Sequence, residues 1–141
     1  MSTEKLSAEA GLTVTLADTA RSIALTSGDC FPEVFATARM IALMEVAAAR
    51  AMQPLLGAGQ LSVGVSLNVR HTAATPIGGR VRAVADYLRT EGRLTHFQVR
   101  AFDDAGPIGE GEHARAVIDT ARLLAGAARR KPDSSTSQGL Q

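Results

Sequence analysis

The clearest pattern along the chain is an apolar run over residues 36–53, ATARMIALMEVAAARAMQ. It is rich in Ala, Leu and Met, which are strong helix formers. Pro54 follows it directly, with Gly57 and Gly59 a few residues later, and these residues end a helix. The run therefore predicts one helix over 36–53. Because apolar residues occur on nearly every side, we expect this helix to be enclosed rather than to lie on a surface.

Four segments after the helix have the alternation and β-branched content that is typical of strands. They cover residues 61–75, 80–90, 93–103 and 108–119. The short links PIGG, EG and DDAG are typical of hairpin turns, so we expect an antiparallel meander. One or two further strands are expected within residues 12–25. This order predicts an α+β fold in which a long antiparallel sheet wraps around a central helix.

The two ends of the chain differ from its middle. Residues 1–10 are polar, and the last residues, ARRKPDSSTSQGLQ, are rich in charged, Ser, Gln and Gly residues. We expect a flexible N-terminus over 1–10, one domain over 11–124 and a disordered C-terminal tail over 125–141.

Composition narrows the class of protein further. The net charge of +1 gives no reason to expect nucleic acid or an anionic membrane as a partner. Charged residues interrupt every apolar stretch before it could span a bilayer, and the N-terminus lacks the pattern of a secretory signal. The single cysteine, Cys30, fits a reducing compartment. We therefore expect a cytoplasmic protein.

Strand alternation assigns side chains to the two faces of the sheet. In the first segment after the helix, one face is expected to carry Val63, Val65, Leu67, Val69 and His71, and the other Gly64, Ser66, Asn68 and Arg70. His71 thus ends an apolar row, where an aliphatic residue would be more usual. The same argument places His96 on the solvent face of a later strand.

Three polar side chains lie where the pattern would otherwise be apolar. Glu45 is inside the helix, and none of its helical neighbours can pair with a carboxylate. Thr37 lies eight residues earlier, about 12 Å along the helix axis. A strand-borne His71 placed across the helix could contact one or both. A carboxylate that orients a histidine, which serves a hydroxyl or a water, is typical of acyl-transfer sites.

Each of these three residues also has an ordinary structural explanation. Thr37 can be the N-cap of the helix. Glu45 can pair with an arginine from a strand or from a second subunit. His71 can be a hydrogen-bonded core residue. The pattern by itself leaves both interpretations open.

Other signals point to no further site. Cys30 could be a thiol nucleophile, but nothing fixes its geometry against a histidine. The stretch GEGEH at 109–113 lacks the spacing of metal ligands, and the chain has no Walker loop or dinucleotide fingerprint. We expect no metal ion and no cofactor. We expect six arginines to lie on a solvated face of the sheet, where one or two of them could hold phosphates at the rim. They are Arg70, Arg80, Arg82, Arg89, Arg93 and Arg100.

Four stretches, FPEVFAT, LMEVAAARAM, HTAATP and GEGEHARAVI, occur in an order that resembles the fluoroacetyl-CoA thioesterase family, which has the hot-dog fold. The resemblance runs from Phe31 to Ile118, and the N-terminal strands match only in pattern. It implies a homodimer whose two sheets join edge to edge, with each active site near the subunit interface. It also implies hydrolysis of a short acyl-CoA to a carboxylic acid and free coenzyme A.

The resemblance assigns roles to individual residues. It implies catalytic roles for Thr37, Glu45 and His71, and substrate contacts for Gly64, Arg115 and Phe31. His71 would be general base and then acid, and Thr37 the nucleophile or the group that positions the thioester or water. Glu45 would orient the histidine or attack the carbonyl itself. Backbone N–H groups at the helix start would stabilise the oxyanion, and Arg115 would contact the coenzyme A portion.

Two departures from the family pattern bear on the substrate. The lid segment SGDCFPE keeps Phe31 but has Gly28 at the earlier aromatic position, and Val46 stands where the family has a tryptophan. Gly28 would loosen the lid and widen the acyl pocket. Selectivity for fluoroacetyl over acetyl is therefore not expected to follow from the resemblance.

Two other functions remain open. Hot-dog acyl-CoA dehydratases and hydratases use a histidine with a carboxylate and have no need of a hydroxyl at Thr37. A non-catalytic acyl-CoA-binding module would bind its ligand without any turnover that depends on His71.

Overall fold

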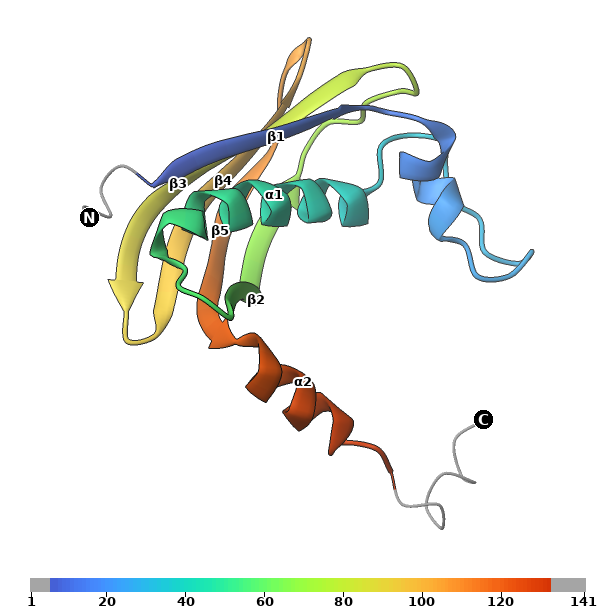
Figure 1. The fold of residues 1–141 in the computed structure, drawn as a ribbon. Helices are drawn as coiled ribbons and strands as arrows, with labels where there is room; N and C mark the ends of the chain where they lie inside the picture. Colours follow the sequence, from blue (N-terminus) through green and yellow to red (C-terminus); the bar gives the residue numbers. More distant parts are fainter. Residues whose placement is uncertain (1–5, 133–141) are drawn as a thin grey trace.

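A five-stranded antiparallel sheet curves around one long helix (Figure 1). The computed structural model describes residues 6–132 of the 141-residue chain. The elements are β1 (Ser7–Thr13), two 3₁₀ helices (Leu16–Asp18 and Ala20–Ile23), α1 (Thr37–Met52), a 3₁₀ turn (Gln53–Leu55), β2 (Gln60–His71), β3 (Arg80–Glu91), β4 (Leu94–Asp103), β5 (Gly106–Asp119) and α2 (Thr120–Ala128). The predicted α+β class, the central helix and the four later strands are confirmed.

The order of strands in the sheet is β1-β3-β4-β5-β2, so only β3, β4 and β5 form a meander. The expectation that β2 joins the same meander is wrong, because β2 pairs with β5 instead of β3. The link after β2 does not form a hairpin. Phe35 N–H donates to the Thr75 carbonyl (2.8 Å), which ties this link to the segment before α1.

The first strand lies earlier than predicted. β1 covers residues 7–13 and pairs with β3, whereas residues 16–23 form 3₁₀ turns instead of a strand. The Asp18 carboxylate accepts hydrogen bonds from the backbone and the hydroxyl of Thr15, both at 2.9 Å, and this local capping competes with strand pairing.

The predicted domain limits meet the structure only in part. Residues 7–10 were expected in a flexible terminus but belong to β1, and residues 125–128 were expected in a disordered tail but belong to α2. Residues 1–5 and 133–141 lie outside the described part of the chain. The limits 11–124 of the domain stay a prediction.

One side of α1 packs on the concave face of the sheet, and the other side is open. The buried residues of α1 are Met40, Leu43, Met44, Ala47, Ala48, Ala51 and Met52. Val46, on the opposite side, is 42% exposed. The prediction of an enclosed helix is therefore wrong for a single chain, because the curved sheet covers only one side. Within residues 6–132, no helix is long and apolar enough to cross a bilayer.

A β-bulge in β2 decides which residues face α1. The pairing of β2 with β5 shifts between Gly64 and Ser66, so Val65 is an extra residue. Gly64 faces Glu45 of α1, and farther along the strand Val69 packs on the core and His71 meets Thr37. The expected strict alternation, which placed Gly64 opposite to His71, is wrong because the bulge reverses it.

Candidate active site

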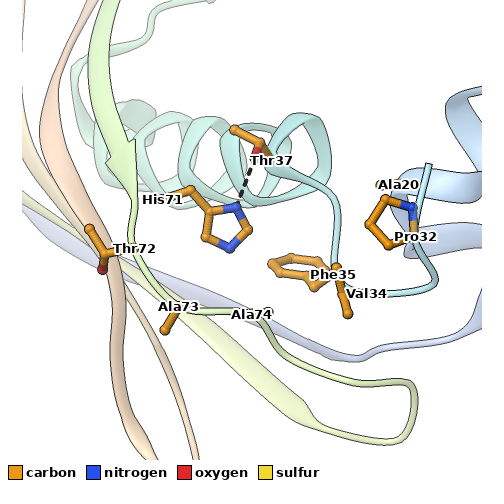
Figure 2. Close-up of a pocket in the computed structure, with 9 residues that line it drawn as sticks. All are labelled: Ala20, Pro32, Val34, Phe35, Thr37, His71, Thr72, Ala73 and Ala74. Atoms are coloured by element: carbon orange, nitrogen blue, oxygen red, sulfur yellow. Dashed lines mark hydrogen bonds between the residues drawn. The ribbon is translucent and has the colours of Figure 1, made fainter. Parts of the chain in front are cut away.

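A hydrogen bond joins Thr37 at the start of α1 to His71 at the end of β2. Thr37 Oγ1 lies 2.8 Å from His71 Nδ1 (Figure 2). The N-cap of α1 is Ala36, and no side chain caps this helix end. The interpretation of Thr37 as an N-cap is therefore wrong, and its hydroxyl serves the histidine instead.

Two backbone contacts hold the two residues in place. Ala36 N–H donates to the Asp18 carbonyl (2.9 Å), which fixes the start of α1 against the 3₁₀ turns. The bond from Phe35 N–H to the Thr75 carbonyl brings the chain after His71 alongside the chain before Thr37. Thr37 and His71 thus meet because the flanks of both elements are tied together.

The pair lies at the edge of a cavity of about 330 Å³. Figure 2 shows its lining residues, which are Ala20, Pro32, Val34, Phe35, Thr37, His71, Thr72, Ala73 and Ala74. The buried Phe35 ring meets the His71 imidazole edge to face, with 6.3 Å between centroids. Apart from the two hydrogen-bonded residues and Thr72, every side chain of the lining is apolar, which suits a small acyl group.

Burial lowers the pKa of His71, although a backbone hydrogen bond with Ala73 opposes this shift. The imidazole is therefore neutral near pH 7 and able to accept a proton. Its Nε2 atom is buried and has no hydrogen-bond partner among residues 6–132.

A second polar cluster forms around Glu45, two turns farther along α1. Glu45 Oε1 lies 3.8 Å from Arg115 Nη1 of β5. A Cβ atom at Gly64 would collide with Glu45 Oε1 and would lie 3.1 Å from His113 Cε1. Only glycine at this position leaves room for the carboxylate between α1 and β2.

Arg115 is only 7% exposed and is held from several sides. Its Nε donates to Ser62 Oγ (3.0 Å), its Nη2 donates to the Ser62 carbonyl (2.9 Å), and its Nη1 lies 3.2 Å from His113 Nε2. Burial lowers the pKa of Arg115, and the charge of Glu45 opposes that shift. The guanidinium is thus a fixed donor aimed at the carboxylate.

The buried His113 completes this cluster. Its Nδ1 is 2.9 Å from the Ser66 carbonyl, which can only accept, so Nδ1 carries the proton. Nε2 is then the acceptor for Arg115. Burial, and to a smaller extent the charge of Arg115, lowers the pKa of His113. The neutral imidazole therefore accepts a hydrogen bond from Arg115 and helps to fix the position of the guanidinium.

The structure brings the expected site residues together in two groups. Thr37 joins His71, and Glu45 joins Gly64 and Arg115. No hydrogen bond or ion pair links Glu45 to His71 within the described residues, so the expected contact of a carboxylate with this histidine is absent from a single chain.

Phe31 and His96 lie elsewhere. Phe31 is 45% exposed and lines a separate surface groove beside Cys30, so its contact with substrate stays a prediction. The His96 side chain is only 12% exposed, because Arg89 and Glu91 cover it on the outer face of the sheet. Its assignment as solvent-facing is wrong in this respect.

Two residues of the site were missed by the sequence analysis. His113 was considered only as a possible metal ligand within GEGEH, and Phe35 was not singled out. Alternation along β5 could have found His113, since it lies two residues before Arg115 and so on the same face.

Comparison with known proteins places this chain in a family. Residues 14–121 match the model of the fluoroacetyl-CoA-specific thioesterase family. The fluoroacetyl-CoA thioesterase of Streptantibioticus cattleyicolor is 45% identical over 102 residues, which is 72% of this chain and 73% of that protein. A solved structure of the fluoroacetyl-CoA thioesterase FlK is 38% identical with a TM-score of 0.81, covering 89% of this chain and 95% of that one.

A more distant neighbour confirms the architecture alone. The hot-dog-like protein of Thermanaerovibrio acidaminovorans is 24% identical with a TM-score of 0.78, covering 94% of this chain and 99% of that one. The chain therefore has the hot-dog fold, and it belongs to the fluoroacetyl-CoA-specific thioesterase family.

Proposed function

We propose that this protein hydrolyses the thioester bond of short-chain acyl-CoA molecules. Water adds at the carbonyl carbon, the C–S bond breaks, and the products are a carboxylic acid and free coenzyme A. Besides membership of the family, the observation that carries this proposal is the Thr37–His71 hydrogen bond at the edge of a small, mostly apolar cavity.

His71 is the general base in this proposal. Its neutral imidazole accepts a proton from the Thr37 hydroxyl, or from a water that this hydroxyl positions, and returns it to the departing thiolate. The first N–H groups of α1 have no intrahelical acceptor, and the helix dipole favours negative charge there. They would stabilise the oxyanion beside Thr37.

Glu45 acts on the substrate instead of on His71 in this proposal. Its carboxylate lies 3.8 Å from the Arg115 guanidinium, and its side chain is 45% exposed. The carboxylate would attack the carbonyl or activate the water, while Arg115 and Gly64 hold it in place beside the thioester. Glu45→Gln should then lose most turnover and keep the fold.

We further propose that the enzyme is a cytoplasmic homodimer. β2 is an edge of the sheet, so its outer backbone groups are free to pair with a second copy. Glu45, Gly64 and the open side of α1 lie next to this edge, which would place each site near the interface. The lone Cys30 fits the reducing cytoplasm.

The first test measures the hydrolysis of acetyl-, fluoroacetyl-, propionyl- and phenylacetyl-CoA by the amount of free thiol that is released. Thr37→Ala and His71→Ala should each lower kcat by roughly 10²- to 10⁴-fold, the usual contribution of acid–base groups. Circular dichroism checks that both variants fold. Undiminished turnover in folded variants would contradict the proposal.

The same panel distinguishes the other functions. Hydration of an enoyl-CoA that survives in Thr37→Val would indicate a hydratase. Acyl-CoA binding without turnover above background would indicate a binding module.

Phe31 and Val46 are 45% and 42% exposed, so neither narrows the cavity in a single chain. We therefore expect kcat/KM for fluoroacetyl- and acetyl-CoA to agree within about tenfold, the scale of discrimination by a small substituent.

A further inference from the structure

α2 follows the end of β5 next to the start of β2 (Figure 1). A second cavity lies there. Its volume is about 610 Å³. Thr120 N–H donates to the Gly59 carbonyl (3.0 Å), which fixes the beginning of α2 against the beginning of β2. We call this cavity the arginine groove, and its lining residues are Gln60, Arg93, Val117, Ile118, Asp119, Arg122, Leu123, Ala125 and Arg129.

Three guanidinium groups of the groove have no ion-pair partner among the described residues. Arg93, Arg122 and Arg129 form no side-chain hydrogen bond or ion pair with any residue between 6 and 132. By contrast, Arg80 and Arg100 on the sheet surface pair with Asp104 and Asp86. Unpaired arginines that line one cavity are typical of a site for anions, above all for phosphate groups, which arginine binds through two parallel N–H donors.

One carboxylate also lines the arginine groove. Asp119 Oδ2 accepts the backbone N–H of Arg122 (2.9 Å) and so caps α2. Its negative charge offsets one of the three guanidinium charges, and the groove keeps a net positive charge. A ligand with more than one phosphate group fits this balance better than a single carboxylate does.

The arginine groove lies farther along the same pair of strands, β2 and β5, as the Glu45 cluster. Arg115 and Val117 are two residues apart on β5 and therefore share a face, and Val117 packs on the core and also lines the groove. Gly64 is opposite Arg115 and Gln60 is opposite Asp119. Four residues of strand separate these pairs, which is about 13 Å. A long ligand could thus reach both places along one face of the sheet.

We propose that the arginine groove binds the phosphate groups of the nucleotide part of coenzyme A. The pantetheine arm then runs along the β2–β5 pair toward Gly64 and Glu45. This inference rests on the proposed function, since it names the part of an acyl-CoA substrate that the groove takes. It assigns part of the affinity for the substrate to the arginine groove and leaves the chemistry to the residues of α1 and β2.

The test compares acetyl-CoA with acetyl-pantetheine, which lacks the nucleotide. In the triple variant Arg93→Gln, Arg122→Gln and Arg129→Gln, KM for acetyl-CoA should rise about tenfold or more at low salt, with kcat within about twofold, because exposed charge pairs contribute modestly and additively. Hydrolysis of acetyl-pantetheine should not change. Arg80→Gln, which removes an exposed arginine elsewhere on the sheet, is the matched control and should leave both substrates unaffected.

An unchanged KM for acetyl-CoA in the triple variant would overturn the proposal. An equal rise in KM for acetyl-pantetheine would overturn it too. All three side chains are exposed, and an unfolding transition like that of the wild type verifies the fold. If the wild type hydrolyses neither thioester, the proposed function fails, and calorimetry with coenzyme A tests the groove separately. Binding about tenfold weaker in the triple variant would then support it, and equal binding would refute it.

Discussion

At the scale of single residues, Gly64 leaves the space that the Glu45 carboxylate occupies. In Gly64→Ala the new Cβ would meet Glu45 Oε1 and His113 Cε1. Glu45 has a flexible side chain that can move away, so we expect little loss of stability. The displaced carboxylate should lower kcat/KM by at least about tenfold, as small misplacements of catalytic groups do. Thioester hydrolysis and a thermal unfolding curve measure the two effects, and a variant with full activity would show that Glu45 need not stay there.

His113 makes stability depend on pH in a definite direction. Burial lowers its pKa from the ordinary value of 6.5, and the unfolded chain restores that value. As pH falls, the unfolded state therefore binds the proton first. The contribution of neutral His113 to the free energy of unfolding is full above pH 6.5, and it is lost as pH falls through the lower pKa of the folded state. Burial shifts the pKa of His71 the same way.

We expect the urea midpoint of unfolding to be lower at about pH 5 than at about pH 7.5. The His113→Gln variant, which has no titrating imidazole at this position, should show a smaller difference between the two pH values. A wild-type midpoint that does not change over this range would contradict the neutral, buried state of both histidines.

At the scale of elements, small residues let α1 lie close to the sheet. Ala47, Ala48 and Ala51 are at most 3% exposed, and Ala83 and Ala85 of β3 are fully buried. Ala47→Leu adds volume where none is free and should lower the free energy of unfolding by about 1–3 kcal/mol. Val46→Leu, at the open side of the helix, should stay within about 0.5 kcal/mol. Denaturant unfolding compares the two variants. Equal free energies of unfolding would mean that α1 packs loosely on the sheet at Ala47.

At the scale of the whole molecule, the free edge of β2 predicts association. Leu61 and Val65 of β2 are 53% and 54% exposed, which is unusual for apolar side chains on a paired strand. Light scattering should give a mass of twice the 14.7 kDa of one chain. Lysines at both positions, Leu61→Lys with Val65→Lys, should produce monomers, because charged edges resist pairing. Leu88→Lys, on the inner strand β3, is the matched control, and a monomeric wild type would refute the homodimer.

Particular residues show how far sequence reasoning reached. The oddity of Glu45 and His71 was visible as polar residues in apolar rows, and the resemblance to a family identified the same positions. The position of Gly64 opposite Glu45 was not visible, because a single extra residue at Val65 inverts the alternation of β2. The 3₁₀ turns at residues 16–23 were missed because the Asp18 capping bonds outweigh the strand-like composition of this stretch.

Local sequence is enough to identify the central helix and the four later strands to within a few residues, but it does not reveal β1 at residues 7–13, the 3₁₀ turns or α2. Helix propensity and alternation are local properties, so neighbouring residues are enough to reveal them. The tertiary structure alone decided that β2 pairs with β5, that Thr37 bonds His71, that His113 supports Arg115 and that three arginines line one groove. Each of these contacts joins separate elements, and its geometry depends on strand register, a bulge and loop anchoring, which the packing of the whole chain sets.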